Sequence, residues 1–148
     1  MTIGFYTTRG DYGCFSNFSD HGFELDGEYW STTEHYFQSQ KFATTPHVKQ
    51  IRLLKTPKEA AIMGRDRSRP LRKDWEEVKD DIMRKAVLRK FDTHPEIREI
   101  LLATGDEEIV ENSPSDYYWG CGKDGSGKNM LGQILMEVRE ILRKGTSE

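Results

Sequence analysis

The spacing of apolar residues predicts a chain that is mainly helical. The longest helix is expected over residues 74–91, where apolar residues recur on one face. The last helix is expected over 129–143, and the side chains predicted to be buried in it are Met130, Leu131, Ile134, Leu135, Val138, Ile141 and Leu142. A shorter helix is expected over 46–55.

Capping residues predict where the remaining helices begin and end. Ser31 is followed three residues later by Glu34, which is a capping-box pattern in front of "EHYFQSQKF". The residues Thr56 and Pro57 resemble an N-cap and a first helical position, and Gly64 ends that helix. A further helix is expected to start from Thr93, with Pro95 and Glu96 in its first turn and Gly105 at its end.

Strand signals are few and short. The stretch "FELDGEYW" (23–30) predicts a β-hairpin whose tight turn is Asp26-Gly27. Residues 2–8 and 107–112 are candidates for two more short strands. We therefore expect a mainly α fold, α+β by strict count: a compact helical bundle with a small N-terminal β-hairpin, formed as one domain by residues 1–148.

Composition narrows the classes of function and location. A net charge of −3, with 32% charged residues, gives no overall basic field for holding nucleic acid. The longest apolar runs are far shorter than a membrane span, and the start, "MTIGFYTTRGDYG", predicts no signal peptide. Cys14 and Cys121 are too few for a disulfide framework, which favours a reducing, cytoplasmic location.

No cofactor is expected from the sequence. The four histidines are scattered, and neither they nor the cysteines have the spacing of a metal site. Two nucleotide-binding spacings nevertheless overlap in "DYYWGCGKDGSGKNMLG" (116–132): Gly120, Gly122 and Gly125 match a dinucleotide loop, and Gly122, Gly127 and Lys128 match a phosphate loop.

Both of these interpretations fail on context. A dinucleotide loop needs a buried strand before it and a second strand after it, and a phosphate loop needs a Ser or Thr where Asn129 stands. The glycines would still allow backbone amides to approach a ligand, and a helix N-terminus near Asn129 favours anionic oxygens. Trp119 offers a flat face to a base or sugar. The alternative is a flexible connection with a helix cap.

Two further polar clusters are candidates for chemistry. Glu34, Gln38 and Lys41 are spaced i, i+4 and i+7 and so share one helix face, which could serve acid–base chemistry or be a solvated polar face. The segment "GRDRSRPLRKDW" (64–75) is rich in arginines, which suit phosphate, although a solvated basic loop has the same composition. Asn17, in "CFSNF", lies between two aromatic residues and could simply be part of a turn.

Together these stretches resemble the YbiA-like, or NADAR, family. The resemblance runs from about Phe15 to Leu142 through "FSNF", "GEYWSTTEHYFQSQKF", "MGRDRSRPLRKDWEEVK", "KFDTHPEIREILLATGD" and "YYWGCGKDGSGKNMLGQILMEVRE". It implies a compact, mainly α fold and an N-glycosidase. Members of the family are described as cleaving the C–N bond of phosphoribosylamino-pyrimidines, the first riboflavin-pathway intermediates, or as removing ADP-ribose from guanine in nucleic acid. Cys121 departs from the acidic or apolar residues common at its position.

The resemblance leads to a hypothesis for the site. Glu34 would be the acid–base group, Lys41 a second catalytic group that forms a Schiff base or holds the sugar and phosphate, and Asp116 a second carboxylate. The substrate-binding residues would be Asn17, Gly64, Arg65, Arg67, Trp119, Gly120, Gly122, Gly127 and Asn129. The expected partner is a small ribosyl phosphate, with no membrane and no metal involved.

Three functions are open at this level. The first is an N-glycosidase of riboflavin intermediates, and the second is a hydrolase of ADP-ribosylated guanine, which alone would involve nucleic acid. The third is a non-catalytic binder of ADP-ribose or a related nucleotide. The isoelectric point near 5.9 favours the first over the second. The presence of Glu34, Lys41 and Asp116 argues against the third.

Overall fold

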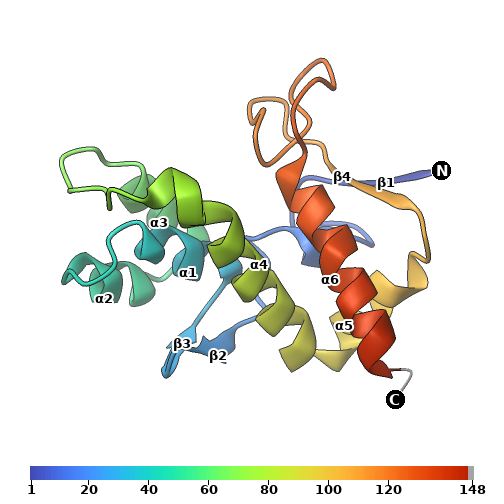
Figure 1. Ribbon diagram of the computed structural model, residues 1–148, viewed down its shortest axis with the longest axis horizontal. Coiled ribbons are helices and arrows are strands. Elements are labelled where there is room, and N and C mark those ends of the chain that lie inside the picture. Colours follow the sequence, from blue (N-terminus) through green and yellow to red (C-terminus); the bar gives the residue numbers. More distant parts are fainter. Residues whose placement is uncertain (147–148) are drawn as a thin grey trace. The chain divides into compact units, whose positions relative to one another are not determined.

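A computed structural model describes residues 1–146 and confirms a mainly helical protein (Figure 1). In that range the helices are α1 (Thr33–Gln40), α2 (His47–Arg52), α3 (Pro57–Gly64), α4 (Trp75–Thr93), α5 (Pro95–Ala103) and α6 (Met130–Thr146). The strands are β1 (Thr2–Phe5), β2 (Phe23–Leu25), β3 (Glu28–Trp30) and β4 (Glu108–Glu111), and Gly13–Phe15 form a short 3₁₀ turn.

The chain divides into two compact units. Unit 1 contains residues 1–16 and the chain from Phe91 onwards, and unit 2 contains residues 17–90. Unit 1 therefore holds β1, β4, α5 and α6, and unit 2 holds the β2–β3 hairpin and α1 to α3. The expectation of a single domain over 1–148 stays a prediction.

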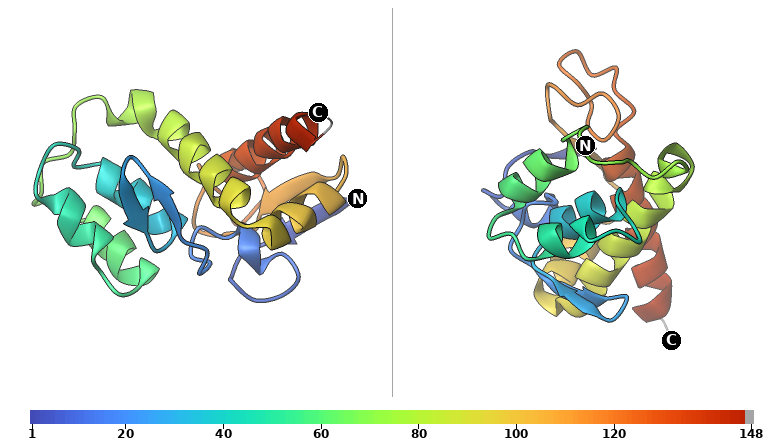
Figure 2. Two further views of the ribbon diagram at one scale, coloured as in Figure 1. Left: turned by 90° about the horizontal axis from the view of Figure 1, so that it is seen from below. Right: turned by 90° about the vertical axis from the view of Figure 1, so that its left-hand side faces the viewer.

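Unit 2 is built around α1, and the hairpin and α1 lie side by side in Figure 2. The hairpin is antiparallel, and Asp26 and Gly27 both have positive φ at its turn, as predicted. Its core side chains are Phe23, Leu25, Trp30, Tyr36 and Ala86. His35 is fully buried and connects α1 to the end of α2, because its Nε2 contacts the carbonyl oxygen of Leu54 at 2.9 Å. These contacts fix the orientation of α1 and therefore of the helix face that carries Glu34, Gln38 and Lys41.

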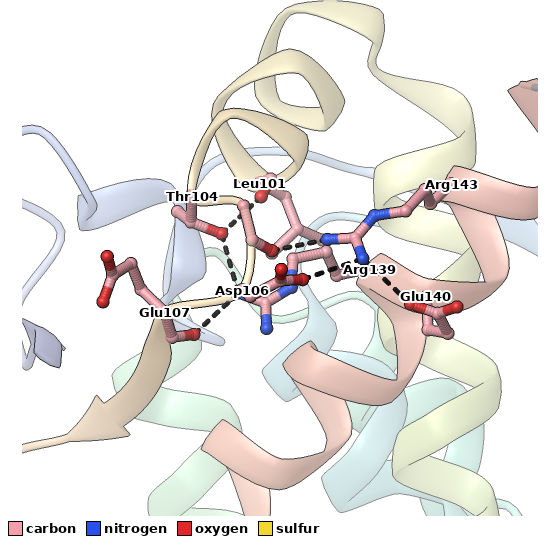
Figure 3. A network of polar contacts seen from close by, with 8 residues as sticks. Leu101, Thr104, Asp106, Glu107, Arg139, Glu140 and Arg143 are labelled. Carbon is pink, nitrogen blue, oxygen red and sulfur yellow. Dashed lines mark hydrogen bonds and ion pairs between the residues drawn. The ribbon is translucent and has the colours of Figure 1, made fainter. Parts of the chain in front are cut away.

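Unit 1 places α6 against β4, which pairs in parallel with β1. A network of polar contacts anchors α6 to the segment between α5 and β4 (Figure 3). Arg139 is buried, and its Nη1 donates to Thr104 Oγ1 at 2.9 Å and to the carbonyl oxygen of Glu107 at 2.8 Å. One turn later, Arg143 forms ion pairs with Asp106 and Glu140.

Three details differ from the sequence-based expectations. Thr32, not Ser31, caps α1, because the Thr32 hydroxyl accepts from the backbone N–H of His35. His94, not Thr93, is the N-cap of α5, since α4 continues to Thr93. In α6, Ile141 is 52% exposed and Met130 is half-buried rather than buried, because the buried face consists of the other apolar residues: Leu131, Ile134, Leu135, Val138 and Leu142.

The described part of the chain has neither a membrane-spanning helix nor a cluster of metal ligands. Within residues 1–146, no helix combines the length and apolar character that crossing a bilayer requires. The same residues contain no group of three or more His, Cys, Asp or Glu side chains arranged to hold a metal ion.

Candidate functional site

The N-terminal turn of α1 holds Glu34 in a buried position. The backbone N–H of Glu34 donates to the carbonyl oxygen of Asn17 at 3.1 Å, which ties the preceding loop to the start of the helix. The Glu34 side chain is not on a solvated face, because the residue is only 6% exposed. Its Oε2 accepts a hydrogen bond from Gln38 Nε2 at 2.8 Å, one helical turn away. A buried carboxylate held in one orientation is suited to proton transfer.

Lys41 is buried at the C-terminal end of the same helix. Its Nζ donates to the carbonyl oxygen of Gly64 at 3.3 Å. The same nitrogen lies 6.0 Å from the centroid of the Phe37 ring and 5.8 Å from that of Trp75. The aromatic rings therefore replace part of the water that would surround an exposed lysine.

The environment of Lys41 changes its protonation. Burial, followed by the positive charges of Arg67, Arg65 and Lys79, lowers the pKa of Lys41 to about 8, although Glu34 acts in the opposite direction. A lysine with such a pKa is neutral in about one tenth of the molecules at pH 7, far more than an ordinary lysine. Neutral amine is the form that adds to a carbonyl or imine carbon.

Positive charge gathers around this lysine. Arg65, Arg67 and Lys79 all act on Lys41 electrostatically, and Glu34 is the carboxylate that acts on it. Arg67 Nη1 also reaches the carbonyl oxygen of Gly64 at 3.5 Å. The side chains of Arg65 and Arg67 are otherwise exposed, so their guanidinium groups are accessible to an anion.

Gly64 lies at the junction of α1 and α3. It is the last residue of α3, and a Cβ placed on it would lie 2.0 Å from Gln38 Oε1. Any side chain at this position would push α3 away from α1. Asn17 contributes differently, because its side-chain amide faces Met83, with Nδ2 at 3.6 Å from the sulfur.

Asp116 lies in unit 1 and caps a turn of the backbone. Its Oδ1 accepts from the backbone N–H of Tyr118 at 3.0 Å and of Trp119 at 2.8 Å. Trp119 is half-buried and packs edge-to-face against Tyr118, with ring centroids 4.9 Å apart. These contacts define the local conformation that leads into the glycine loop.

The glycine loop folds back on the N-terminus of α6, and it extends beyond that helix end in Figure 1. The backbone N–H groups of residues 128, 129, 130 and 131 donate to the carbonyl oxygens of residues 117, 120, 118 and 119, at 2.9 to 3.1 Å. The expectation that these helix amides face an anionic ligand is therefore wrong, because the loop itself occupies them.

Close packing explains the glycines of this loop. Gly122 has a φ of 73° and lies against the ring of Tyr117, and a Cβ on Gly127 would lie 2.4 Å from the carbonyl oxygen of Gly120. Asn129 also has a structural contact: its Oδ1 accepts from the N–H of Glu111, and its Nδ2 donates to the carbonyl oxygen of Ile109. Asn129 thus ties the end of the loop to β4.

The structure accordingly brings one group of the predicted site residues together. Glu34, Lys41 and Gly64 are in contact or share a common neighbour in unit 2, and the positive charges of Arg65 and Arg67 act on Lys41. Asn17 joins them through the backbone. The other group belongs to unit 1: Asp116, Trp119, Gly120, Gly122, Gly127 and Asn129. The substrate-binding roles of both groups stay predictions.

Three neighbours of Lys41 were not predicted as site residues. Phe37 lies one turn before Lys41 on α1, so the helical spacing could have found it. Trp75 and Lys79 come from α4, more than 30 residues later, and no local pattern connects them to Lys41.

Comparisons with known proteins show which family the chain resembles in sequence. A model of the NADAR domain matches residues 4–143. An N-glycosidase of Nostoc punctiforme, Npun_R5314, is 55% identical over 97% of this chain and 94% of its own length. The N-glycosidase YbiA of Escherichia coli is 53% identical over 95% of this chain and 88% of its own length.

A solved structure and a more distant relative are also similar to this chain. The NMR structure of E. coli YbiA matches with a TM-score of 0.92 at 51% identity, covering 99% of this chain and 88% of that one. The riboflavin biosynthesis protein PYRR of Zea mays is 42% identical over 95% of this chain, which corresponds to 25% of the maize protein.

Proposed function

Since the chain belongs to the NADAR domain family and is an N-glycosidase, we propose that it hydrolyses the C–N glycosidic bond of phosphoribosylamino-pyrimidines, the early intermediates of riboflavin biosynthesis. The enzyme class rests on relatives that are 53–55% identical over nearly the whole chain. The choice of substrate is supported by relatives named as riboflavin biosynthesis proteins, from maize and from Vibrio vulnificus.

One observation carries the proposal: a buried carboxylate and a buried lysine of lowered pKa lie on one helix face, within a cluster of positive charges. A phosphoribosyl group has a phosphate and an electrophilic anomeric carbon. The guanidinium groups of Arg65 and Arg67 suit the phosphate. Glu34 and Lys41 supply the proton transfer and the nucleophile that cleavage at that carbon requires.

The proposed reaction proceeds through the ring-opened sugar. Glu34 assists proton transfer as the ring opens to an imine at C1. The neutral amine of Lys41 adds to C1, and the aminopyrimidine leaves with a proton, which gives a lysine Schiff base. Water then hydrolyses the Schiff base, releasing ribose 5-phosphate and restoring Lys41. The net reaction consumes one water.

Mutation of either group tests the mechanism. Glu34→Gln and Lys41→Ala should each lower turnover at least about 100-fold, the usual size of an acid–base or nucleophile contribution, while the circular dichroism spectrum stays that of the folded protein. Borohydride added during turnover should trap the ribosyl group on Lys41, detectable by mass spectrometry. A variant with near-normal turnover would rule out the role of that residue.

A side-by-side release assay tests the substrate. A phosphoribosylamino-pyrimidine and an oligonucleotide with ADP-ribosylated guanine would be incubated with the same enzyme sample. We expect release from the first, because a chain with a net charge of −3 attracts nucleic acid poorly. Release only from the oligonucleotide would support the ADP-ribosyl-guanine hydrolase instead. Binding of ADP-ribose without release of either product would indicate a non-catalytic binder.

A further inference from the structure

The amide of Gln38 lies between the carboxylate of Glu34 and the backbone of Gly64. Gln38 is 4% exposed, and its Nε2 donates to Glu34 Oε2 at 2.8 Å. An ionised carboxylate can only accept hydrogen bonds, so the NH₂ end of the amide must face Glu34. The oxygen end faces Gly64, where a Cβ would come within 2.0 Å of it.

Gln38 therefore connects Glu34 with the residue that holds Lys41, the two side chains of the proposed reaction. On one side it contacts Glu34, and on the other it packs on the residue whose carbonyl oxygen accepts from Lys41 Nζ. The absence of a side chain at Gly64 makes room for this arrangement, since even the Cβ of Gln38 would lie only 2.8 Å from an added methyl group.

The side-chain oxygen of Gln38 lowers the stability of the folded protein. Gln38 Oε1 is buried, and no hydrogen-bond partner for it exists among residues 1–146. An unsatisfied buried carbonyl group is unfavourable for folding, and native proteins contain few of them. A leucine or methionine would fill the same space without that penalty. Folding stability alone therefore does not explain a glutamine here.

We propose that Gln38 is a positioning residue for the N-glycosidase reaction, which holds the carboxylate of Glu34 in one orientation through its Nε2–H group. This inference rests on the proposed role of Glu34. Because Gln38 acts through Glu34 at the chemical step, its loss affects kcat rather than KM, and it changes the pH at which Glu34 loses its proton.

The test compares Gln38→Leu and Gln38→Glu with Gln40→Leu, a matched control on the same helix. The Gln40 amide contacts Ser39 rather than a predicted site residue. Each protein would be assayed for kcat and KM against pH, with the substrate that is turned over in the release assay. The titration of the Glu34 carboxyl carbon would be followed in parallel by NMR, which needs no substrate.

We expect Gln38→Leu to lower kcat about 10–100-fold, the cost of a misplaced catalytic group, with little change in KM. The Glu34 titration midpoint and the acidic limb of the rate profile should move up by about one pH unit, the value of a hydrogen bond to a charged group. Gln38→Glu should move both further, because two adjacent carboxylates share a proton. Gln40→Leu should behave as the wild type.

Gly64→Ala offers a second route to the same result, since the added methyl group displaces the same amide. If Gln38→Leu does not fold, the Glu34 midpoint in Gly64→Ala decides the question. An unchanged kcat and an unchanged midpoint overturn the inference. If Glu34→Gln itself keeps normal turnover, the proposed role of Glu34 fails instead. Loss of activity in Glu34→Gln together with normal Gln38 variants rejects the positioning role alone.

Discussion

At the scale of single residues, Lys41 shows how local surroundings change the chemistry of a side chain. Its position at the end of α1 gives its amine a backbone acceptor in Gly64 and two aromatic neighbours, Phe37 and Trp75. Burial and nearby cations then favour the neutral amine. The same residue on a solvated helix face would be a permanent cation at neutral pH.

The lowered pKa of Lys41 has a consequence for stability. The pKa of Lys41 is about 8 in the fold against an ordinary value of 10.5, so between these values the unfolded chain binds more protons than the folded one. Stability should therefore rise with pH in this window, by up to about 2–3 kcal/mol. Urea unfolding of the wild type and of Lys41→Met at pH 7.5 to 10.5, at about half-unit steps, measures the difference. Parallel curves for the two proteins would contradict the shift.

Asp116 allows charge and turn capping to be separated. Asparagine keeps the Oδ1 that accepts from the backbone of Tyr118 and Trp119 but removes the negative charge. If the carboxylate takes part in catalysis, Asp116→Asn should lower turnover about 100-fold with little loss of stability. Asp116→Ala should also cost about 1 kcal/mol of unfolding free energy, by analogy with the loss of a cap. Normal turnover in Asp116→Asn would leave Asp116 as a turn residue only.

At the scale of elements, helix caps and turns could be predicted from the sequence, whereas the pairing of distant strands could not. Thr56 and Glu59 form the reciprocal contacts of a capping box at α3, and Gly105 has the positive φ expected after α5. Both signals lie within a few residues of the element they define. The parallel pairing of β1 with β4 joins Thr2 to Glu108, and neither strand contains information about its partner. The one-residue error at Ser31 arose because Thr32 has an equivalent hydroxyl.

The arginines of α6 provide a test at this scale. Arg139 is buried and donates to Thr104 and to the backbone of Glu107 (Figure 3), whereas the side chain of Arg143 is more exposed. Arg139→Met should cost about 2–4 kcal/mol, because it leaves one buried and one partly buried acceptor without this donor. Arg143→Met is the matched control one turn away and should cost about 1 kcal/mol or less. If chemical denaturation gives equal losses of unfolding free energy for the two variants, the burial of Arg139 does not determine its contribution to stability.

At the scale of the whole molecule, net charge and local charge have opposite signs. The chain carries −3 overall, yet Arg65, Arg67 and Lys79 surround Lys41 with positive charge. The helical stripe of Glu34, Gln38 and Lys41 was predictable because it repeats at helical spacing. The approach of Gly64 and of α4 to that stripe was not, because contacts between separate helices leave no periodic signal in the sequence.

The single-domain prediction can be tested through the tryptophans. Trp119 lies in unit 1, and Trp30 and Trp75 lie in unit 2. In Trp119→Phe the fluorescence reports on unit 2, and in the double variant Trp30→Phe/Trp75→Phe it reports on unit 1. For one cooperative domain, the fluorescence midpoint of each variant should coincide with its own circular dichroism midpoint in urea. Separate transitions would mean that the two units unfold independently.

The return of the glycine loop onto α6 also determines how fast its protons exchange with solvent. An exposed glycine-rich segment ordinarily exchanges its amide hydrogens quickly, because nothing protects them. Here the amides of residues 128–131 donate to carbonyl oxygens of residues 117–120. Exchange at these four positions requires the loop to separate from the helix, so their protection measures the free energy of that opening. A segment that resembles a flexible ligand loop in sequence thus becomes a reporter of local unfolding.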